Sequence, residues 1–144
     1  MSADWEISPA LALAQLQASL TRADAGAGPA KLRLFTTPRP SSILTVHTDT
    51  PQAEIRLAKP CGALVDGTLV LFPADPAGAM VAAQGMPRWA DWVAGDGVVL
   101  THCDVTDLAH DGGIRVTGGA TPEGETSPML YPGGLVQLSL VALT

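Results

Sequence analysis

The sequence predicts a mainly β protein with one N-terminal α-helix. The strands are expected to form an antiparallel β-sandwich, and a jelly roll is one topology that such a sandwich can have. Two observations lead to this prediction. Apolar residues have helical spacing in one stretch near the N-terminus, and from Lys31 onward they alternate with polar residues at a period of two. Gly, Pro or Asp then interrupts the chain at intervals of about eight to twelve residues, as in sandwiches and barrels. The 144 residues are predicted to form a single domain, with the helix over 8–25 and the sandwich over 31–144.

The predicted helix has clear start signals and one narrow apolar stripe. Ser8 can accept a hydrogen bond from a free N–H of the first turn, and Pro9 suits the first helical position because its missing N–H would stay unpaired there. Leu13, Leu16 and Leu20 form the stripe. We expect this stripe to cover the sandwich, and a contact with another subunit is the alternative.

The rest of the chain predicts roughly eight to ten short strands. The strongest local signal is Asp66-Gly67, which stands between two apolar runs and favours a two-residue hairpin turn. Strands are expected over 32–34, 43–47, 55–57, 62–72 as that hairpin, 88–93 paired with 98–103, and 114–117 paired with 135–143. The segments 37–51 and 118–134 are rich in Pro, Gly or Ser, and we expect mainly exposed loops there, where partners could bind.

Composition and charge exclude several classes of protein. A count of 8 Lys and Arg against 14 Asp and Glu gives a formal net charge of −6, which argues against a surface that binds nucleic-acid phosphates. No apolar run reaches the length of about 18 residues that a membrane-spanning helix needs. The acidic residues Asp4 and Glu6 do not fit a secretory signal. Cys61 and Cys103 are expected to be reduced and buried, and the sequence leaves a single bridge between them open.

The sequence shows no catalytic or metal-binding motif, so we expect no catalytic residue, no metal site and no cofactor. His102 and Cys103 are adjacent on a predicted strand and therefore point to opposite faces, which argues against a shared zinc ion. We interpret the acidic residues in the middle of the chain as turn and loop residues rather than as a carboxylate pair or a calcium site. These residues are Asp91, Asp96, Asp104, Asp107 and Asp111.

Two tryptophans are the candidate binding residues. Trp89 and Trp92 could stack on a sugar, which would make the protein a carbohydrate-binding module. They lie three residues apart, however, and therefore on opposite sides of a strand. This spacing favours packing, with one ring in the core and the other half-exposed, over a flat platform of two rings.

Several motifs follow one another in an order that extends from about residue 8 to the end of the chain. They are DAGAGPAKLRLFTTPRP over 24–40, LAKPCGALVDGTL over 57–69, AQGMPRWADWVAGDG over 83–97, CDV over 103–105 and LYPGGLVQL over 130–138. In this order they resemble a family of small, poorly characterised proteins encoded by tailed phages and prophages of proteobacteria, which look like virion structural components.

The resemblance implies a non-enzymatic module of the phage particle, on capsid or tail, that is made in the host cytoplasm and incorporated into the virion. Its expected partners are further copies of itself in a homo-oligomer and other virion proteins, with no nucleic acid and no membrane. The alternative is a carbohydrate- or ligand-binding module that uses Trp89 or Trp92. A second alternative is a hydrolase with carboxylates from distant strands.

Overall fold

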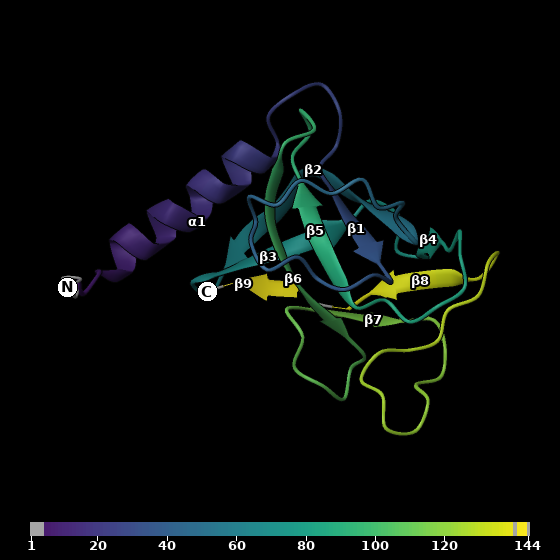
Figure 1. The fold of residues 1–144 in the computed structure, drawn as a ribbon. Helices are drawn as coiled ribbons and strands as arrows, with labels where there is room; N and C mark the ends of the chain where they lie inside the picture. Colours follow the sequence, from purple (N-terminus) through teal and green to yellow (C-terminus); the bar gives the residue numbers. More distant parts are fainter. Residues whose placement is uncertain (1–4, 140, 144) are drawn as a thin grey trace.

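The computed structural model describes residues 5–139 and 141–143, and it shows a body of β-strands with one helix (Figure 1). The elements are α1 (Pro9–Ala23), β1 (Lys31–Phe35), β2 (Ala53–Val65), β3 (Thr68–Pro73), β4 (Ala79–Met80), β5 (Trp89–Val93), β6 (Val99–Thr106), β7 (Ile114–Thr117), β8 (Leu135–Leu138) and β9 (Val141–Leu143). The predicted class, mainly β with one N-terminal helix, is confirmed.

Local chemistry sets both ends of α1. The Oγ of Ser8 accepts a hydrogen bond from the N–H of Leu11 at 3.2 Å, which confirms the predicted N-cap. The helix ends at Asp24, and Gly26 follows with a φ of 97°. A Cβ at Gly26 would lie 2.7 Å from the backbone nitrogen of Asp96, so both the turn and the close approach of the two segments require glycine.

Only the C-terminal half of α1 packs on the strands. Leu20 and Ala23 are buried, and Leu16 packs against the same core beside β2 and β3. The N-terminal half extends away from the body (Figure 1), and Leu13 is 39% exposed. The prediction that the leucine stripe covers the β-body is therefore confirmed for Leu16 and Leu20 and wrong for Leu13. Within the described residues, no helix has the length and apolar character needed to cross a bilayer.

The described strands form one sheet in the order β4-β8-β7-β6-β5-β1-β2-β3-β9. Neighbouring strands are antiparallel except for β6 and β7, which run parallel and pair through Val105↔Ile114 and Thr106↔Arg115. The prediction of wholly antiparallel strands is wrong at this pair, because the loop after β6 turns back and re-enters the sheet in the same direction. The predicted pairings within 62–72 and between 88–93 and 98–103 are confirmed.

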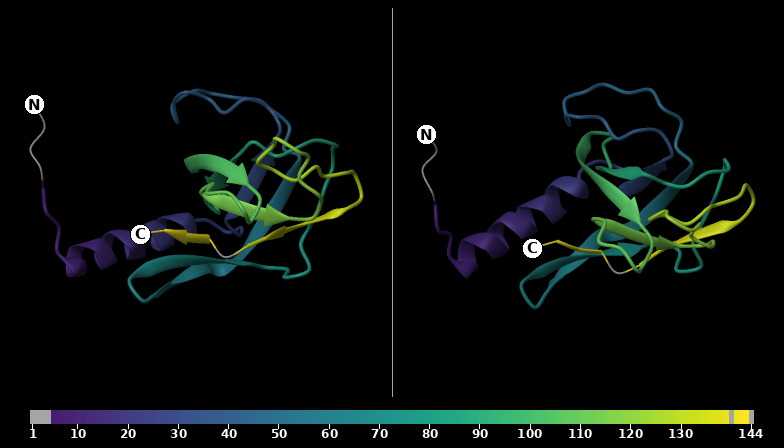
Figure 2. Two further views of the ribbon diagram at one scale, coloured as in Figure 1. Left: turned by 90° about the horizontal axis from the view of Figure 1, so that it is seen from below. Right: turned by 60° about the horizontal axis from the view of Figure 1, so that its bottom comes forward.

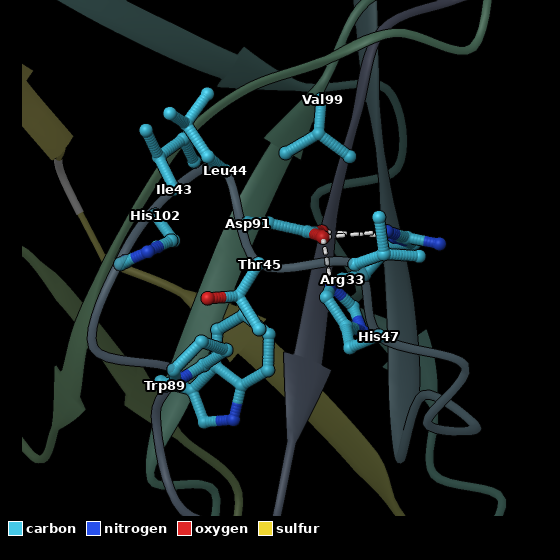
Figure 3. Close-up of a pocket in the computed structure, with 11 residues that line it drawn as sticks. Arg33, Ile43, Leu44, Thr45, His47, Trp89, Asp91, Val99 and His102 are labelled. Atoms are coloured by element: carbon cyan, nitrogen blue, oxygen red, sulfur yellow. Dashed lines mark hydrogen bonds and ion pairs between the residues drawn. The ribbon is translucent and has the colours of Figure 1, made fainter.

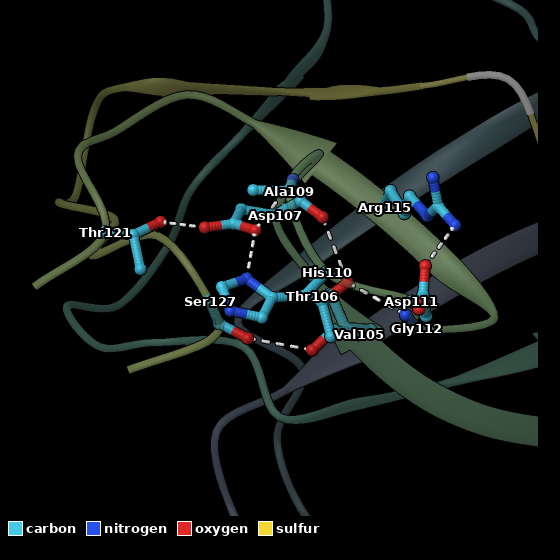
Figure 4. A network of polar contacts seen from close by, with 10 residues as sticks. All are labelled: Val105, Thr106, Asp107, Ala109, His110, Asp111, Gly112, Arg115, Thr121 and Ser127. Atoms are coloured by element: carbon cyan, nitrogen blue, oxygen red, sulfur yellow. Dashed lines mark hydrogen bonds and ion pairs between the residues drawn. The ribbon is translucent and has the colours of Figure 1, made fainter. Parts of the chain in front are cut away.

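Asp107 organises the loop that joins β6 to β7 (Figure 4). Its carboxylate accepts a hydrogen bond from Thr121 Oγ1 at 2.5 Å and lies 2.7 Å from His110 Nδ1. These bonds, that of Thr121 above all, lower the pKa of Asp107 below its ordinary value. Farther along the loop, the N–H of Gly112 donates to Thr106 Oγ1 at 3.0 Å. Side-chain hydrogen bonds therefore hold this connection in place of strand pairing.

The sheet curls so that its ends approach each other (Figure 2). The first half of β2 pairs with β1 and its second half with β3, with a register shift between Leu57 and Gly62. Strand β4, at the opposite edge of the sheet, contacts β2, and the N–H of Ala82 donates to the carbonyl of Gln52 at 2.8 Å. The core cluster takes residues from both ends of the sheet and so lies inside the curl. Its largest fully buried aliphatic members are Leu32, Leu34, Leu57, Leu69 and Leu130.

The clearest departure from the predicted strands is the segment 43–47, which contains no strand. It belongs to residues 36–51, called the strap below, which arch over the outer face of the sheet (Figure 2). The prolines of this segment lack N–H donors, and Ser42 Oγ accepts a hydrogen bond from the N–H of Leu44 at 3.1 Å. Turn bonds therefore replace the pairing that the β-branched residues of 43–47 would otherwise favour.

Two smaller differences concern short strands. The predicted strand over 135–143 divides into β8, which pairs with β7 as expected, and β9, which pairs with β3 instead. Strand β4 was not predicted, because two residues are too few to show an alternating pattern.

Candidate functional site

The outer face of the sheet beneath the strap carries a row of polar side chains. In β1, Leu32 and Leu34 are buried in the core, and Arg33 points to the opposite face because side chains alternate along a strand. The register places Arg33 directly opposite Asp91 of β5 and Asp91 directly opposite His102 of β6. Three neighbouring strands thus bring a cation, an anion and an imidazole side by side.

Arg33 and Asp91 form an ion pair that is joined by two hydrogen bonds (Figure 3). Arg33 Nε donates to Asp91 Oδ1 at 2.8 Å, and a terminal nitrogen of the same guanidinium donates to Oδ2 at 2.5 Å. The Asp91 side chain has no exposed surface, whereas that of Arg33 is 23% exposed. The hydrogen bonds to Asp91 are the main reason why the pKa of Arg33 is raised above its ordinary value.

Three contacts fix the strap, one between its own two ends and two with this face. Near its start, Thr37 Oγ1 donates to Asp49 Oδ2 at 2.8 Å, which joins the two ends of the strap. Two residues after Thr37, Arg39 Nε donates to Nδ1 of His102 at 2.8 Å. Toward its end, His47 Nε2 lies 3.5 Å from Asp91 Oδ2. These contacts hold the strap over the ion pair.

A cavity of about 250 Å³ lies between the strap and the sheet (Figure 3). Its walls combine apolar strap residues with Trp89, whose ring stacks on Phe35 with centroids 4.3 Å apart. The rings of His47 and His102 meet Trp89 edge to face, with centroids 4.9 and 5.7 Å away. Ile43, Leu44 and Val46 of the strap form much of the rim and are exposed.

The hydrogen bonds of this cluster limit what it can do chemically. Arg33 occupies both oxygens of Asp91, and His102 Nδ1 accepts from Arg39, so neither group is open to take a proton from a substrate. In the described part of the chain, no serine, threonine or cysteine side chain is hydrogen-bonded to either His47 or His102. The arrangement suits attachment of the strap better than activation of a nucleophile.

The two predicted binding tryptophans lie on opposite faces of β5. Trp89 is fully buried under the strap and lines the cavity, and its Nε1 donates to Thr37 Oγ1 at 3.3 Å. Trp92 belongs to the core cluster inside the curl. Both rings are buried, so the expectation of one half-exposed ring is wrong, because the strap covers the outer face at Trp89.

The acidic residues divide between turns and strands. Asp96 and Asp107 accept backbone N–H bonds in turns, as predicted. Asp91 lies within β5 and Asp104 within β6, so the turn and loop interpretation is wrong for these two. Asp111, in the β6–β7 loop, accepts a hydrogen bond from a side chain rather than from a turn N–H. Among the described residues, no group of three His, Cys, Asp or Glu side chains is placed to hold a metal ion.

Both cysteines are free thiols, as expected, but Cys103 is only partly buried, so the expectation of burial is wrong for it. Cys61 is buried, and its N–H donates to Asp24 Oδ1 at 3.0 Å, which ties β2 to the end of α1. Burial raises the pKa of Cys61 to about 12 and that of Cys103 to about 11. Cys103 packs against the core, whereas His102 lies on the strap side, which confirms that these neighbours face opposite ways.

A second hollow, called the helix groove below, lies between α1 and the strands β5 and β6. Its volume is about 430 Å³. It is lined by Gln15, Ala18, Ser19 and Arg22 of α1 and by Trp92 and Leu100 of the strands. Arg22 is paired with Asp96 at 3.0 Å at one end of the groove. Beyond the other end lie the exposed residues Leu11 of α1 and, before the helix begins, Ile7 and Trp5.

Sequence reasoning found Trp89 and Asp91 as residues of interest but missed Arg33, His47 and the helix groove. Alternation along β1 and β5 places Arg33 and Asp91 on polar faces, but the order of the strands is needed to place them opposite each other. The sequence did carry one signal for the helix groove, since residues 7–21 contain no Asp, Glu, Lys or Arg, but the leucine stripe alone did not reveal it.

Comparisons with known proteins do not add to this picture. No protein-family model matches the chain, and neither the curated proteins nor the solved structures contain a match.

Proposed function

We propose that this protein is a non-enzymatic structural component of a phage or prophage particle, on capsid or tail, which assembles with copies of itself and with other virion proteins. The observation that carries the proposal is the exposed N-terminal half of α1. Trp5 is 86% exposed and Leu11 is 47% exposed, and both lie on a segment that extends away from the β-body. Large apolar side chains presented in this way are typical of a surface that another protein covers.

The β-body supports the same role. The curl of the sheet brings β4 against β2, which gives the body two opposed walls around one core, and we take the sandwich of the jelly-roll kind as part of this proposal. The ion pair between Arg33 and Asp91 and the strap contacts stiffen the outer wall. A particle protein that is made in the host cytoplasm and then built into a virion benefits from such a body, because its contacts must persist.

Mass spectrometry of purified particles tests the proposal. Particles of the phage that encodes this chain are induced, purified by density and digested, and the unassembled lysate serves as the comparison. We expect peptides of this chain in intact particles at a fixed ratio to the major capsid or tail protein. Peptides that occur in the lysate and are missing from intact particles would contradict the proposal.

A second candidate function rests on the strap cavity. Trp89 lines a hollow of about 250 Å³ together with Arg33 and His102, which is the kind of site that takes a small ligand such as a sugar unit. Titration of the protein with a panel of mono- and oligosaccharides, followed by tryptophan fluorescence, tests it. Because Trp89 is itself the reporter, the Trp89→Phe variant is titrated by calorimetry, and a variant that keeps its stability but no longer binds the sugar would favour this function over assembly alone.

A further inference from the structure

The exposed part of α1 carries no charge. From Ile7 to Thr21 the chain contains no Asp, Glu, Lys or Arg, although most of these side chains face away from the β-body. Solvated surfaces of soluble proteins carry about a quarter to a third of charged residues. Depletion of charge marks the centre of protein–protein interfaces. The composition of α1 therefore fits a helix that is covered in the assembled protein.

One side of α1 combines a ridge and a hollow. Leu11, Gln15, Ala18 and Arg22 recur at helical spacing and face away from Leu20, which is buried in the core. Three of them line the helix groove, and Leu11 continues the same side beyond the groove. A surface that carries both a projecting Leu11 and a groove lined by Ala18, Trp92 and Leu100 can pair with an identical surface, which is the condition for a two-fold symmetric contact.

We propose that two copies of the chain pack through α1, antiparallel, so that each copy seats the N-terminal half of its helix in the helix groove of the other. This inference rests on the proposed function in assembly and names the partner. With Gln15 of one copy opposite Gln15 of the other, Leu11 lies level with Ser19 of the second copy, in the middle of its groove. Trp5 and Ile7 then lie toward the Arg22 end, close to Leu100 of the second copy.

The exposed area favours this partner. Trp5, Ile7 and Leu11 are 86%, 43% and 47% exposed. If full side chains have about 180–250 Å² of surface, they leave roughly 380 Å² of mainly apolar area uncovered. A stable interface buries about 800 Å² on each partner. The three side chains and the walls of the groove together supply an area of that order, and the groove is sized for one large apolar side chain and its neighbours.

Charge favours a second copy over a charged partner. Each chain has a net charge of −6, so two copies repel over most of their surfaces and can approach most easily along residues 7–21, which include no charged side chain. A charged partner would find no free counter-charge in the groove, since Arg22 is already paired with Asp96 at 3.0 Å. Gln15 of each copy can donate to and accept from its counterpart, because an amide carries both groups.

The oligomeric state of the full chain tests the inference. We expect the wild type to sediment as a dimer at low micromolar concentration. Leu11→Glu should raise the dissociation constant at least about 30-fold, because one charge from each copy enters an apolar contact. Leu108→Glu is the matched control, since Leu108 is 52% exposed on the β6–β7 loop, and it should leave the dimer unchanged. Circular dichroism checks that both variants keep the wild-type fold.

A cysteine at the symmetry axis tests the orientation. Gln15→Cys should form a disulfide between two copies under mild oxidation, while the buried Cys61 stays reduced. A wild type that is monomeric would overturn the inference, and so would a dimer that Leu11→Glu leaves intact. If the protein is a dimer but the Gln15→Cys variant forms no cross-link, the antiparallel arrangement of the two helices is wrong.

Particle incorporation separates this inference from the proposed function. If the chain forms dimers that depend on Leu11 but is missing from particles, the proposed interface is correct and the role in the virion is wrong. If the chain is a monomer and the Leu11→Glu variant is no longer incorporated into particles, the helix binds a different virion protein. This result would overturn the proposal that its partner is a second copy of the chain.

Discussion

Replacing Arg33 by methionine removes the positive partner of a carboxylate that water does not reach. The Asp91 side chain has no exposed surface, and two hydrogen bonds of 2.8 and 2.5 Å join it to the guanidinium. Methionine keeps the length and packing of the arginine stem without its charge. The variant therefore leaves an unpaired negative charge beneath the strap, and we expect it to lower the free energy of unfolding.

The size of the effect follows from the burial of the two partners. Removing one partner of a buried ion pair costs about 3–5 kcal/mol. Arg33 is 23% exposed, and His47 Nε2 lies 3.5 Å from the same carboxylate, so we expect a loss near the lower end, about 3 kcal/mol. The double variant Arg33→Met/Asp91→Leu removes both charges and should fall within about 1–2 kcal/mol of the wild type.

Urea unfolding followed by tryptophan fluorescence measures these differences. The matched control is Lys31→Met, because Lys31 lies on the same face of β1 and pairs with Glu54 at 3.3 Å, with the two side chains 34% and 44% exposed. This exposed pair should contribute less than about 0.5 kcal/mol. Equal losses for Arg33→Met and Lys31→Met would refute the reasoning, because the strap would then not exclude water from the pair.

Three further predictions concern other parts of the fold. Gly62→Ala should lower the melting temperature, with a cost of about 2 kcal/mol or more, because a Cβ would overlap the carbonyl oxygen of Val70 on the paired strand. Thr121→Val should lower the urea midpoint at pH 7. The hydrogen bond holds the pKa of Asp107 below its ordinary 3.8, so its stabilisation is present above that pH, and the difference from wild type should shrink as the pH falls below 3.8 and Asp107 takes up a proton. Cys61, with its pKa raised to about 12, should not react with a thiol reagent at pH 8 until urea unfolds the chain.

The elements that local sequence determines were predicted well. Ser8 caps α1, and the Asp66-Gly67 turn has positive φ at both residues, 50° and 77°, as a two-residue hairpin of this kind requires. These features depend on interactions within a few residues, so one segment carries all the information. The same reasoning fails for 43–47, where β-branched composition favours a strand but the segment belongs to the strap, which arches over the outer face of the sheet.

The candidate site could be predicted only in part. The alternation of β1 shows that Arg33 faces away from the core, and Asp91 was recognised as one of a group of acidic residues. Their contact was not predictable, since β1 and β5 are separated by more than fifty residues and their register depends on the order of the whole sheet. Burial of Trp89 depends in the same way on a strap whose path no local pattern shows.

The sequence by itself determined the class of the fold, the start of the helix and the hairpin turns, because hydrophobic periodicity and turn chemistry act between near neighbours. Only the tertiary structure decided which strands meet, that β6 and β7 run parallel, and that half of α1 stays uncovered. Those features depend on how a curled sheet closes around one core, and that closure is set by contacts between residues that lie far apart in the chain.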